Sequence, residues 1–257
     1  PVQVDPILFG LLTFCKSHYE LVKGQTNVAM GSVLSIWHEY REAGLDDPDN
    51  AKLPPMEDLQ AAAQHMDINN LILDAENQTV YFADPEMKLD VGAVAKGYAT
   101  EIVGQMLLSG DMPSFIISAG GNVRMGIAPA DGRAKWGVGI QDPDGAVLGL
   151  SDIVETLFLT NASVVTSGDY QRFYIVDGQR YHHLIDPDTL MPDTEFRSVS
   201  IITEDSGYAD LLSTAAFLMP YDESRAFIES LDGVEALWCT PDGEVIQSSG
   251  WADHEKK

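Results

Sequence analysis

Residues 89–101 read LDVGAVAKGYATE, and the prediction of the fold starts from this stretch. It begins as an extended segment, turns at Gly92 and continues as a helix that contains Lys96. A helix N-terminus carries unpaired N–H groups and roughly half a unit of positive charge, so it favours phosphate or carboxylate groups. Small residues at the turn would let a ligand approach closely. Taken alone, the stretch fits a plain strand-to-helix connection with a surface lysine better, because it matches no standard phosphate-loop pattern.

The composition is that of an acidic, soluble globular chain. Its 257 residues include 40 acidic and 15 basic ones, giving a net charge of −25, and 45% are hydrophobic. This length fits one large domain or two small ones. The charge argues against binding nucleic acid or an anionic membrane surface, and an anionic ligand would need local positive groups or metal ions. No apolar run could span a bilayer and no signal peptide is visible; because the chain begins with Pro1, we expect a mature or trimmed form.

Hydrophobic periodicity and turn residues predict a mixture of helices and strands. Trp37 is predicted as a core residue and residues 44–55 as a loop, whereas a loop followed by a short helix ending at Trp37, over residues 25–37, is implied only by the family resemblance described below. Cys15 and Cys239 are expected to be separate buried thiols, with a single disulfide as the less favoured alternative. Helices are predicted at 5–23, 56–66, 93–108, 208–219 and 222–231, the last with Asp222 as N-cap. Strands are predicted at 71–73, 79–82, 115–118, 136–141, 157–160, 163–166, 172–176, 180–185, 198–203, 234–240 and 244–248.

Asp210 and Thr214 lie four residues apart on a predicted helix, so they share one face of it. A carboxylate with a hydroxyl is an oxygen-only pair that suits a hard cation such as Mg²⁺. In the alternative, Asp210 caps the helix N-terminus and Thr214 bonds back to a carbonyl. The spacing alone favours that alternative.

His183 directly precedes Leu184 and Ile185 in a predicted strand. A histidine beside a reacting phosphoryl group could accept the proton of an attacking hydroxyl. Alternatively, it is a strand histidine bonded to a neighbouring carboxylate such as Asp186. Strand alternation places His182 on the opposite face, so His182 is the weaker candidate.

Further segments, read together with 89–101, carry a family resemblance: SAGGN at 118–122, TSGDY at 166–170, HHLIDPDT at 182–189 and YADLLSTAA at 208–216. Their order, spacing and wording resemble the ApbE family, flavin transferases that move FMN from FAD onto a protein threonine or serine. The resemblance runs from about the start of the chain to Ser249. It implies an α+β fold, one domain over residues 1–257 with mixed and antiparallel sheets packed with helices. An early strand of the family domain is not represented before Pro1. The family usually has glycine where this chain has Leu190.

The resemblance also implies roles for individual residues. It implies a Mg²⁺ site built from the carbonyl of Ala93 with Asp210 and Thr214, and His183 as the catalytic base. Lys96 is expected to contact phosphate or a site carboxylate. We expect FAD in a cleft formed by residues around 25–27, 90–96, 118–122 and 166–168. The implied cofactor-binding residues are Gln25, Thr26, Asn27, Asp90, Lys96, Gly120, Gly121, Ser167, Gly168, Leu184 and Ile185, of which the first three replace the family's Ala-Phe-Asp loop end.

The implied activity is Mg²⁺-dependent transfer of FMN from FAD to a threonine or serine hydroxyl of a partner protein, with release of AMP. Mg²⁺ would neutralise the pyrophosphate in this acidic protein and stabilise the leaving group. Two alternatives are an FAD pyrophosphatase that gives FMN and AMP, and an FAD-binding protein without turnover. The resemblance further implies an acceptor flavoprotein, such as a subunit of a membrane redox complex. It implies an extracytoplasmic, membrane-anchored lipoprotein as well.

Overall fold

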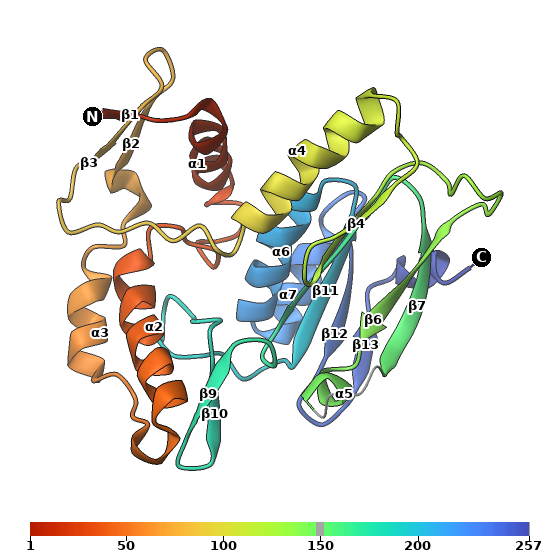
Figure 1. The fold of residues 1–257 in the computed structure, drawn as a ribbon. Coiled ribbons are helices and arrows are strands. Elements are labelled where there is room, and N and C mark those ends of the chain that lie inside the picture. Colours follow the sequence, from red (N-terminus) through yellow and green to blue (C-terminus); the bar gives the residue numbers. More distant parts are fainter. Residues whose placement is uncertain (148–151, 257) are drawn as a thin grey trace. The chain divides into compact units, whose positions relative to one another are not determined.

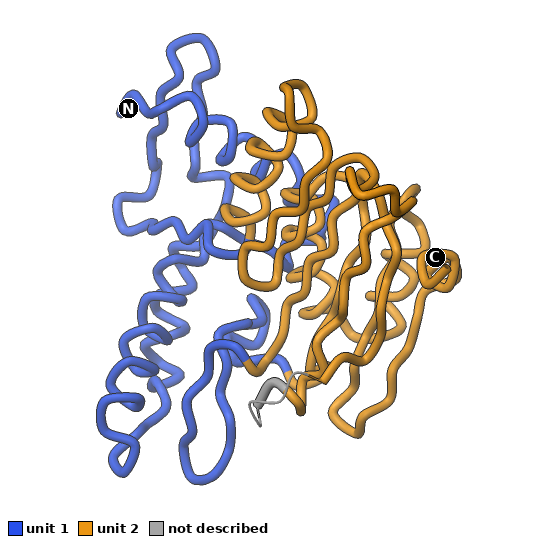
Figure 2. The backbone as a smooth tube through the Cα atoms, turned by 45° about the vertical axis from the view of Figure 1, so that its right-hand side comes forward, with its two compact units in different colours: residues 1–93, 171–193 blue, residues 94–170, 194–257 orange. Residues whose placement is uncertain are grey.

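The computed structural model describes residues 1–147 and 152–256, so residues 148–151 and 257 of the expected domain 1–257 lie outside the described residues. The chain divides into two compact units, each made of two separate stretches (Figure 2). Unit 1 contains residues 1–93 and 171–193, and unit 2 contains residues 94–170 and 194–257. Each unit has its own sheet and its own hydrophobic core. That one domain spans the whole chain stays a prediction.

Unit 1 combines a small antiparallel sheet of order β1-β3-β2, helices, and the β9–β10 hairpin (Figure 1). Its core contains Trp37, Leu59 and Tyr174, and the Trp37 indole donates a hydrogen bond to the carbonyl of Leu190 at 2.9 Å. The prediction that Trp37 is a core residue is confirmed. The elements of unit 1 are β1 (Val2–Gln3), α1 (Pro6–His18), α2 (Gly31–Asp46), η1 (Pro48–Asn50), α3 (Met56–Ala63), η2 (Ile68–Asn70), β2 (Leu71–Asp74), β3 (Thr79–Phe82), β9 (Phe173–Val176) and β10 (Gln179–His182).

Unit 2 is built on a six-stranded antiparallel sheet of order β13-β12-β11-β8-β5-β4, together with the β6–β7 pair. The predicted α+β class is thereby confirmed. The elements of unit 2 are α4 (Ala95–Ser109), β4 (Ile116–Ser118), β5 (Asn122–Met125), β6 (Trp136–Gln141), α5 (Pro143–Val147), β7 (Ile153–Leu159), β8 (Ser163–Gly168), β11 (Ser198–Thr203), α6 (Ser206–Leu218), α7 (Tyr221–Glu229), β12 (Glu235–Cys239), β13 (Val245–Gln247) and η3 (Trp251–His254).

The sheet of unit 2 is covered on both faces, with α4, α6 and α7 on one side and β6–β7 on the other (Figure 1). Alternate residues of β8 and β11 therefore meet different neighbours. Val164 and Ile202 join the core that includes Leu157 on β7, whereas Ser167 faces α6. Every residue of α6 except Tyr208 is buried, because this helix lies between the sheet and its neighbouring helices.

Several predicted boundaries were wrong, for identifiable reasons. The first helix ends at His18 and not at residue 23, and α2 runs on to Asp46 through a stretch predicted as loop. Gly44 suggested that loop, yet it lies inside α2, where glycine serves close packing, because a Cβ there would lie 2.6 Å from the Tyr174 ring. The N-cap position of α7 is occupied by Pro220, and Asp222, which was predicted as the N-cap, lies in the first turn of the helix. Strand β5 was not predicted, because its first residue was assigned to a strand end.

Cys15 and Cys239 are buried free thiols, as predicted. Within the described ranges, no helix combines the length and the apolar character needed to cross a bilayer.

Candidate functional site

The Asp210 carboxylate lies where the starts of α4 and α6 meet. Its Oδ1 atom accepts a hydrogen bond from the Lys96 ammonium at 3.0 Å, and its Oδ2 atom accepts one from the Gly97 amide at 2.7 Å. Both donors come from the first turn of α4, whose amides have no partner within their own helix. The sequence stretch that suggested an anion-binding helix start therefore does bind an anion, a carboxylate of the same protein.

Gly97 makes this close approach of α4 and α6 possible. A Cβ atom at this position would lie 2.3 Å from the carbonyl oxygen of Ser206 and 2.5 Å from the Cβ of Asp210. Both atoms belong to α6, and the first is backbone, which cannot move away cheaply. The small residue beside Lys96 thus serves helix packing and, through it, the position of Asp210.

Burial raises the pKa of the Asp210 carboxyl, while the charge of Lys96 and the hydrogen bonds from Lys96 and Gly97 oppose part of that rise. The Asp210 side chain is 5% exposed and that of Lys96 38%. The interpretation of Asp210 as the helix cap is wrong, because α6 begins earlier, at Ser206. Its N-cap is Asp205, which accepts from the Tyr208 amide at 2.8 Å.

Thr214 lies one turn further along α6, on the face that contacts β8. Its hydroxyl is 3.3 Å from the hydroxyl of Ser167, which also bonds Ser213 at 2.9 Å. Asp210, Thr214 and Ser167 therefore give unit 2 a run of oxygen donors. Ser167 and Thr214 were both predicted site residues, and the structure brings them together.

This donor set fits a hard divalent cation that takes the rest of its ligands from a bound molecule. The residues in the described ranges contain no group of three His, Cys, Asp or Glu side chains that could hold a metal by themselves. The carboxylate of Asp210 nevertheless already attracts one cation, the Lys96 ammonium. Ala93 is the last residue of the first stretch of unit 1, and its carbonyl as a third ligand stays a prediction.

The predicted glycine pair forms the β4–β5 hairpin turn. Gly120 and Gly121 have φ values of 56° and 83°, and the amide of Ala119 donates to the carbonyl of Asn122 at 2.8 Å. Two successive positive φ angles are the signature of a two-residue hairpin turn, which glycine adopts without strain. The Thr166 amide donates to the Gly121 carbonyl at 2.8 Å, so this turn is joined to the TSGDY segment.

A buried ion pair that sequence reasoning missed anchors the start of α6. Arg124 on β5 is fully buried, and its Nε donates to Glu101 Oε2 at 2.9 Å. The same Glu101 oxygen accepts the Ser206 amide at 2.8 Å. Glu101 thus joins α4, β5 and α6 one helical turn beyond Lys96. Its position at the end of the 89–101 stretch was a signal, but nothing in the sequence connected it with Arg124.

Asn122 is a second missed residue, although it ends the SAGGN segment. It is fully buried, and its Oδ1 accepts from the Ser206 hydroxyl at 2.6 Å. Its Nδ2 has no hydrogen-bond partner among the described residues, and a Cβ on Gly97 would lie 3.0 Å from it. Asn122 therefore helps to hold the same junction of α4 with α6.

In unit 1, the loop at 25–27 lies beside the segment that contains Asp90. The Asp90 amide donates to the carbonyl of Val28 at 2.8 Å, and Asp90 Oδ1 accepts from the Gly92 amide at 2.8 Å. The Asn27 side chain ties this loop to the segment after α3, since its Nδ2 donates to the carbonyl of Met66 while its Oδ1 accepts from the amide of Ala29. Two of the predicted flavin-contacting segments are thus adjacent.

The two histidines have different environments, although the predicted strand 180–185 ends at His182 and His183 lies beyond it. His182 ends β10, is buried, and bonds the carbonyl of Asp193 at 2.6 Å and the amide of Leu184 at 3.2 Å. The Nδ1 atom of His183 is buried with no hydrogen-bond partner among the described residues. Burial, with the nearby charges of Arg172, His182 and Arg41, lowers the pKa of His183 to about 3. The His183 ring is therefore neutral near pH 7 and has an unused nitrogen.

The segment after His183 is a tight turn. Leu184 and Ile185 are buried, and Ile185 packs in the core of unit 1. Asp186 Oδ1 accepts from the amides of Asp188 and Thr189, and Asp186 therefore serves this turn and not His183. Leu190 has a φ of 60°, a left-handed conformation that favours glycine, and this explains why the resembling family usually has glycine there.

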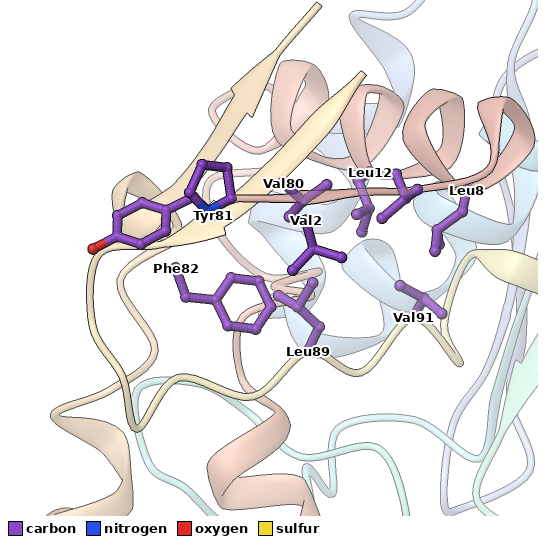
Figure 3. Close-up of a pocket in the computed structure, with 10 residues that line it drawn as sticks. Val2, Leu8, Leu12, Val80, Tyr81, Phe82, Leu89 and Val91 are labelled. Carbon is purple, nitrogen blue, oxygen red and sulfur yellow. The ribbon is translucent and has the colours of Figure 1, made fainter. Parts of the chain in front are cut away.

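An apolar pocket of about 420 Å³ lies elsewhere in unit 1 (Figure 3). It is lined mainly by Val2, Leu8, Leu12, Val80 and Phe82, from β1, α1 and β3. Leu89 and Val91 line it as well, so the pocket adjoins the predicted segment 90–96 through the residues on either side of Asp90. The polar side chains described above are not among its lining residues.

Comparison with known proteins identifies the family. Residues 1–238 match the ApbE family. A protein of Treponema pallidum named FAD:protein FMN transferase is 36% identical over 98% of this chain and 71% of its own length, and a Klebsiella pneumoniae protein of the same name is 30% identical over 97% and 74%. The crystal structure of the ApbE protein from Thermotoga maritima is 33% identical, with a TM-score of 0.86, over 100% of this chain and 80% of that one. The chain therefore belongs to the ApbE family.

Proposed function

We propose that this protein transfers FMN from FAD to a threonine or serine hydroxyl of a partner protein, with Mg²⁺, and releases AMP. The observation that carries the proposal is the Asp210 site, a buried carboxylate at a helix start that already binds one cation. Relatives named FAD:protein FMN transferase that align over nearly the whole chain support it. The two groups of predicted residues supply complementary chemistry, cation binding in unit 2 and proton acceptance in unit 1.

The transfer is a single phosphoryl substitution. The acceptor oxygen forms a bond to the FMN phosphorus, and the bond from that phosphorus to the bridging oxygen breaks, so that AMP leaves with that oxygen. The hydroxyl proton goes to the ring of His183, which is neutral and carries an unused nitrogen. An anionic phosphate near this ring raises the pKa of His183, so the histidine becomes a stronger base when FAD is bound.

Asp210 and Thr214 are the side chains that would hold Mg²⁺, with FAD oxygens completing its ligands. The ion would supply charge neutralisation at the pyrophosphate. Phosphoryl transfer depends mainly on positioning and electrostatics, so the task of unit 2 is to fix the reacting phosphates. Lys96 and the start of α4 offer further positive groups for this purpose.

The acceptor and the location are proposed on the family resemblance. The proposed acceptor is a flavoprotein subunit, for instance of a membrane redox complex. The protein itself is proposed to be an extracytoplasmic lipoprotein anchored to the membrane. A net charge of −25 makes nucleic acid an unsuitable partner.

FAD is expected to bind the purified protein and, with Mg²⁺ and a threonine-containing acceptor peptide, to yield FMN-peptide and AMP in equal amounts. Titration should shift the flavin spectrum and raise the melting temperature. Mass spectrometry of the peptide and chromatography of the nucleotides measure the products. Free FMN plus AMP, independent of peptide, would identify a pyrophosphatase instead. Binding without either product would identify a flavin-binding protein, and no binding would refute all three.

Mg²⁺ and FAD are expected to strengthen each other's binding by the same factor, because coupling between two ligands is reciprocal. Asp210→Asn keeps the shape of the side chain and removes its charge, so it should abolish this coupling while the fold persists. Thr214→Ala should weaken the coupling less, since a neutral hydroxyl is the weaker ligand. Calorimetry of FAD binding in Mg²⁺ and in EDTA measures both effects. Equal FAD affinity in the two buffers would contradict the metal assignment.

A further inference from the structure

The ion pair of Lys96 and Asp210 occupies the position that a divalent cation would need. The Lys96 ammonium is 3.0 Å from Asp210 Oδ1, and the Gly97 amide is 2.7 Å from Oδ2. Both oxygens of the carboxylate are therefore engaged. A metal ion on Oδ1 and an ammonium hydrogen-bonded to the same oxygen would repel each other, so each weakens the binding of the other.

We propose that Lys96 is a built-in counterion of Asp210 that exchanges with the divalent cation, so that Lys96 competes with the metal in the free protein. This inference rests on the proposed function for the identity of the cation. It assigns Lys96 a role that a simple phosphate contact would not include: the lysine sets how weakly the metal binds before FAD arrives.

The burial of the two partners makes the exchange physically reasonable. The Asp210 side chain is 5% exposed, and a buried carboxylate without a positive partner is costly, so some cation must stay near it. The Lys96 side chain is 38% exposed and has four rotatable methylene groups, so its ammonium can move into water without moving the backbone. Asp210 is fixed on α6, whereas Lys96 is the mobile partner.

The charge balance gives the exchange a direction. With Lys96 bound, the pair carries no net charge, and the neighbouring Thr214 and Ser167 hydroxyls add none. The free protein therefore offers a divalent cation little net attraction at this point. A pyrophosphate near the start of α4 offers the Lys96 ammonium an alternative anion, which frees Asp210 Oδ1 for the metal. Nucleotide and metal would then enter as a set, with Lys96 moving from carboxylate to phosphate.

Lys96→Met tests the exchange, because it removes the ammonium and keeps most of the side-chain length. The experiment measures Mg²⁺ binding to the whole protein without FAD, by calorimetry at pH 8. We expect the variant to bind Mg²⁺ about tenfold more tightly than the wild type, since one competing charge-assisted hydrogen bond is gone. Without metal its melting temperature should be lower than that of the wild type, and Mg²⁺ should raise it by more.

Lys135→Met is the matched control. Lys135 is half-buried and, in the described structure, bonds only the carbonyl of Lys256 at 2.9 Å, so this variant makes the same change in net charge away from the site. It should bind Mg²⁺ as the wild type does. The double variant Lys96→Met/Asp210→Asn should not show the increase in Mg²⁺ affinity expected for Lys96→Met, and this would locate the competition at Asp210.

Mg²⁺ affinity in Lys96→Met that equals or falls below that of the wild type would overturn the exchange. That outcome is separate from a failure of the proposed function, which the product assay with FAD decides. A wild type that transfers FMN, with no gain in Lys96→Met, refutes only the exchange. A tenfold gain in a protein without flavin chemistry supports the exchange and refutes the transferase proposal.

Discussion

His183→Ala is expected to lower the rate of FMN transfer by roughly a hundred- to ten-thousand-fold, the usual contribution of a general base, while FAD still binds. His183 carries a buried Nδ1 that bonds no described residue, so the ring loses no hydrogen bond there when it is removed. Single-turnover transfer to an acceptor peptide measures the rate, and calorimetry measures FAD affinity. Unchanged transfer would mean that the hydroxyl is activated by metal or substrate.

His182→Ala is the comparison that separates the two neighbours. His182 holds the carbonyl of Asp193 and the amide of Leu184, so its loss should lower the melting temperature more than it lowers the transfer rate of the folded enzyme. A larger loss of transfer rate in His182→Ala than in His183→Ala would show that the assignment of the two faces is wrong. His183→Gln preserves side-chain volume and covers the case in which His183→Ala folds poorly.

The low pKa of His183 also predicts how stability depends on pH. Its folded value of about 3 lies below the ordinary value of 6.5, so the unfolded chain binds a proton that the native state does not. The stability that comes from keeping His183 neutral is therefore fully present above pH 6.5, and it is lost as the pH falls from 6.5 toward 3. In His183→Gln, urea denaturation should show a smaller loss of stability over this range than in the wild type.

Arg124→Met is expected to destabilise the fold by about 3–5 kcal/mol, because it leaves Glu101 buried without its positive partner. The Glu101 side chain is 10% exposed, and its Oε2 also holds the first amide of α6. The loss should therefore affect the start of the helix that carries Asp210. Urea denaturation followed by circular dichroism measures the free energy of unfolding.

A surface pair and a double variant provide the controls. Arg133 and Asp131 are each more than half exposed, so Arg133→Met should change stability far less than Arg124→Met does. The double variant Glu101→Met/Arg124→Met should be more stable than Arg124→Met, since neither charge is then buried alone. Arg124→Met within about 1 kcal/mol of the wild type would show that water reaches Glu101 or that a new partner replaces arginine.

Local sequence patterns predicted the elements that carry the site, because short-range physics determines them. A small-residue turn before a helical repeat located the start of α4 to within two residues, and the four-residue spacing placed Asp210 and Thr214 on one helix. His182 and His183 do have different environments, although β10 ends at His182, so strand alternation does not account for the difference. Each of these inferences needed only residues close together in the chain.

The contacts that sequence reasoning could not supply involve partners that only the tertiary fold brings together. Lys96 was expected to contact phosphate or a site carboxylate, and its contact with Asp210 is confirmed, but nothing in the sequence identified a partner 114 residues away. The Arg124–Glu101 pair was missed because a strand arginine gives no local signal that it is fully buried. Ile185 packs in the core of unit 1, a contact that depends on α2 and α3, and its role in binding the cofactor stays a prediction.

The division of each unit into two stretches determines when it can fold during synthesis. The chain passes between the units after residues 93, 170 and 193. Residues 1–93 leave the ribosome long before Tyr174 and Val176, which fill the same core as Trp37. The sheet of unit 2 is completed later still during synthesis, because its inner strand β11 follows residue 193. Both units are therefore completed late, with apolar surface exposed to chaperones and proteases until then, and no single cut in the gene yields either unit whole.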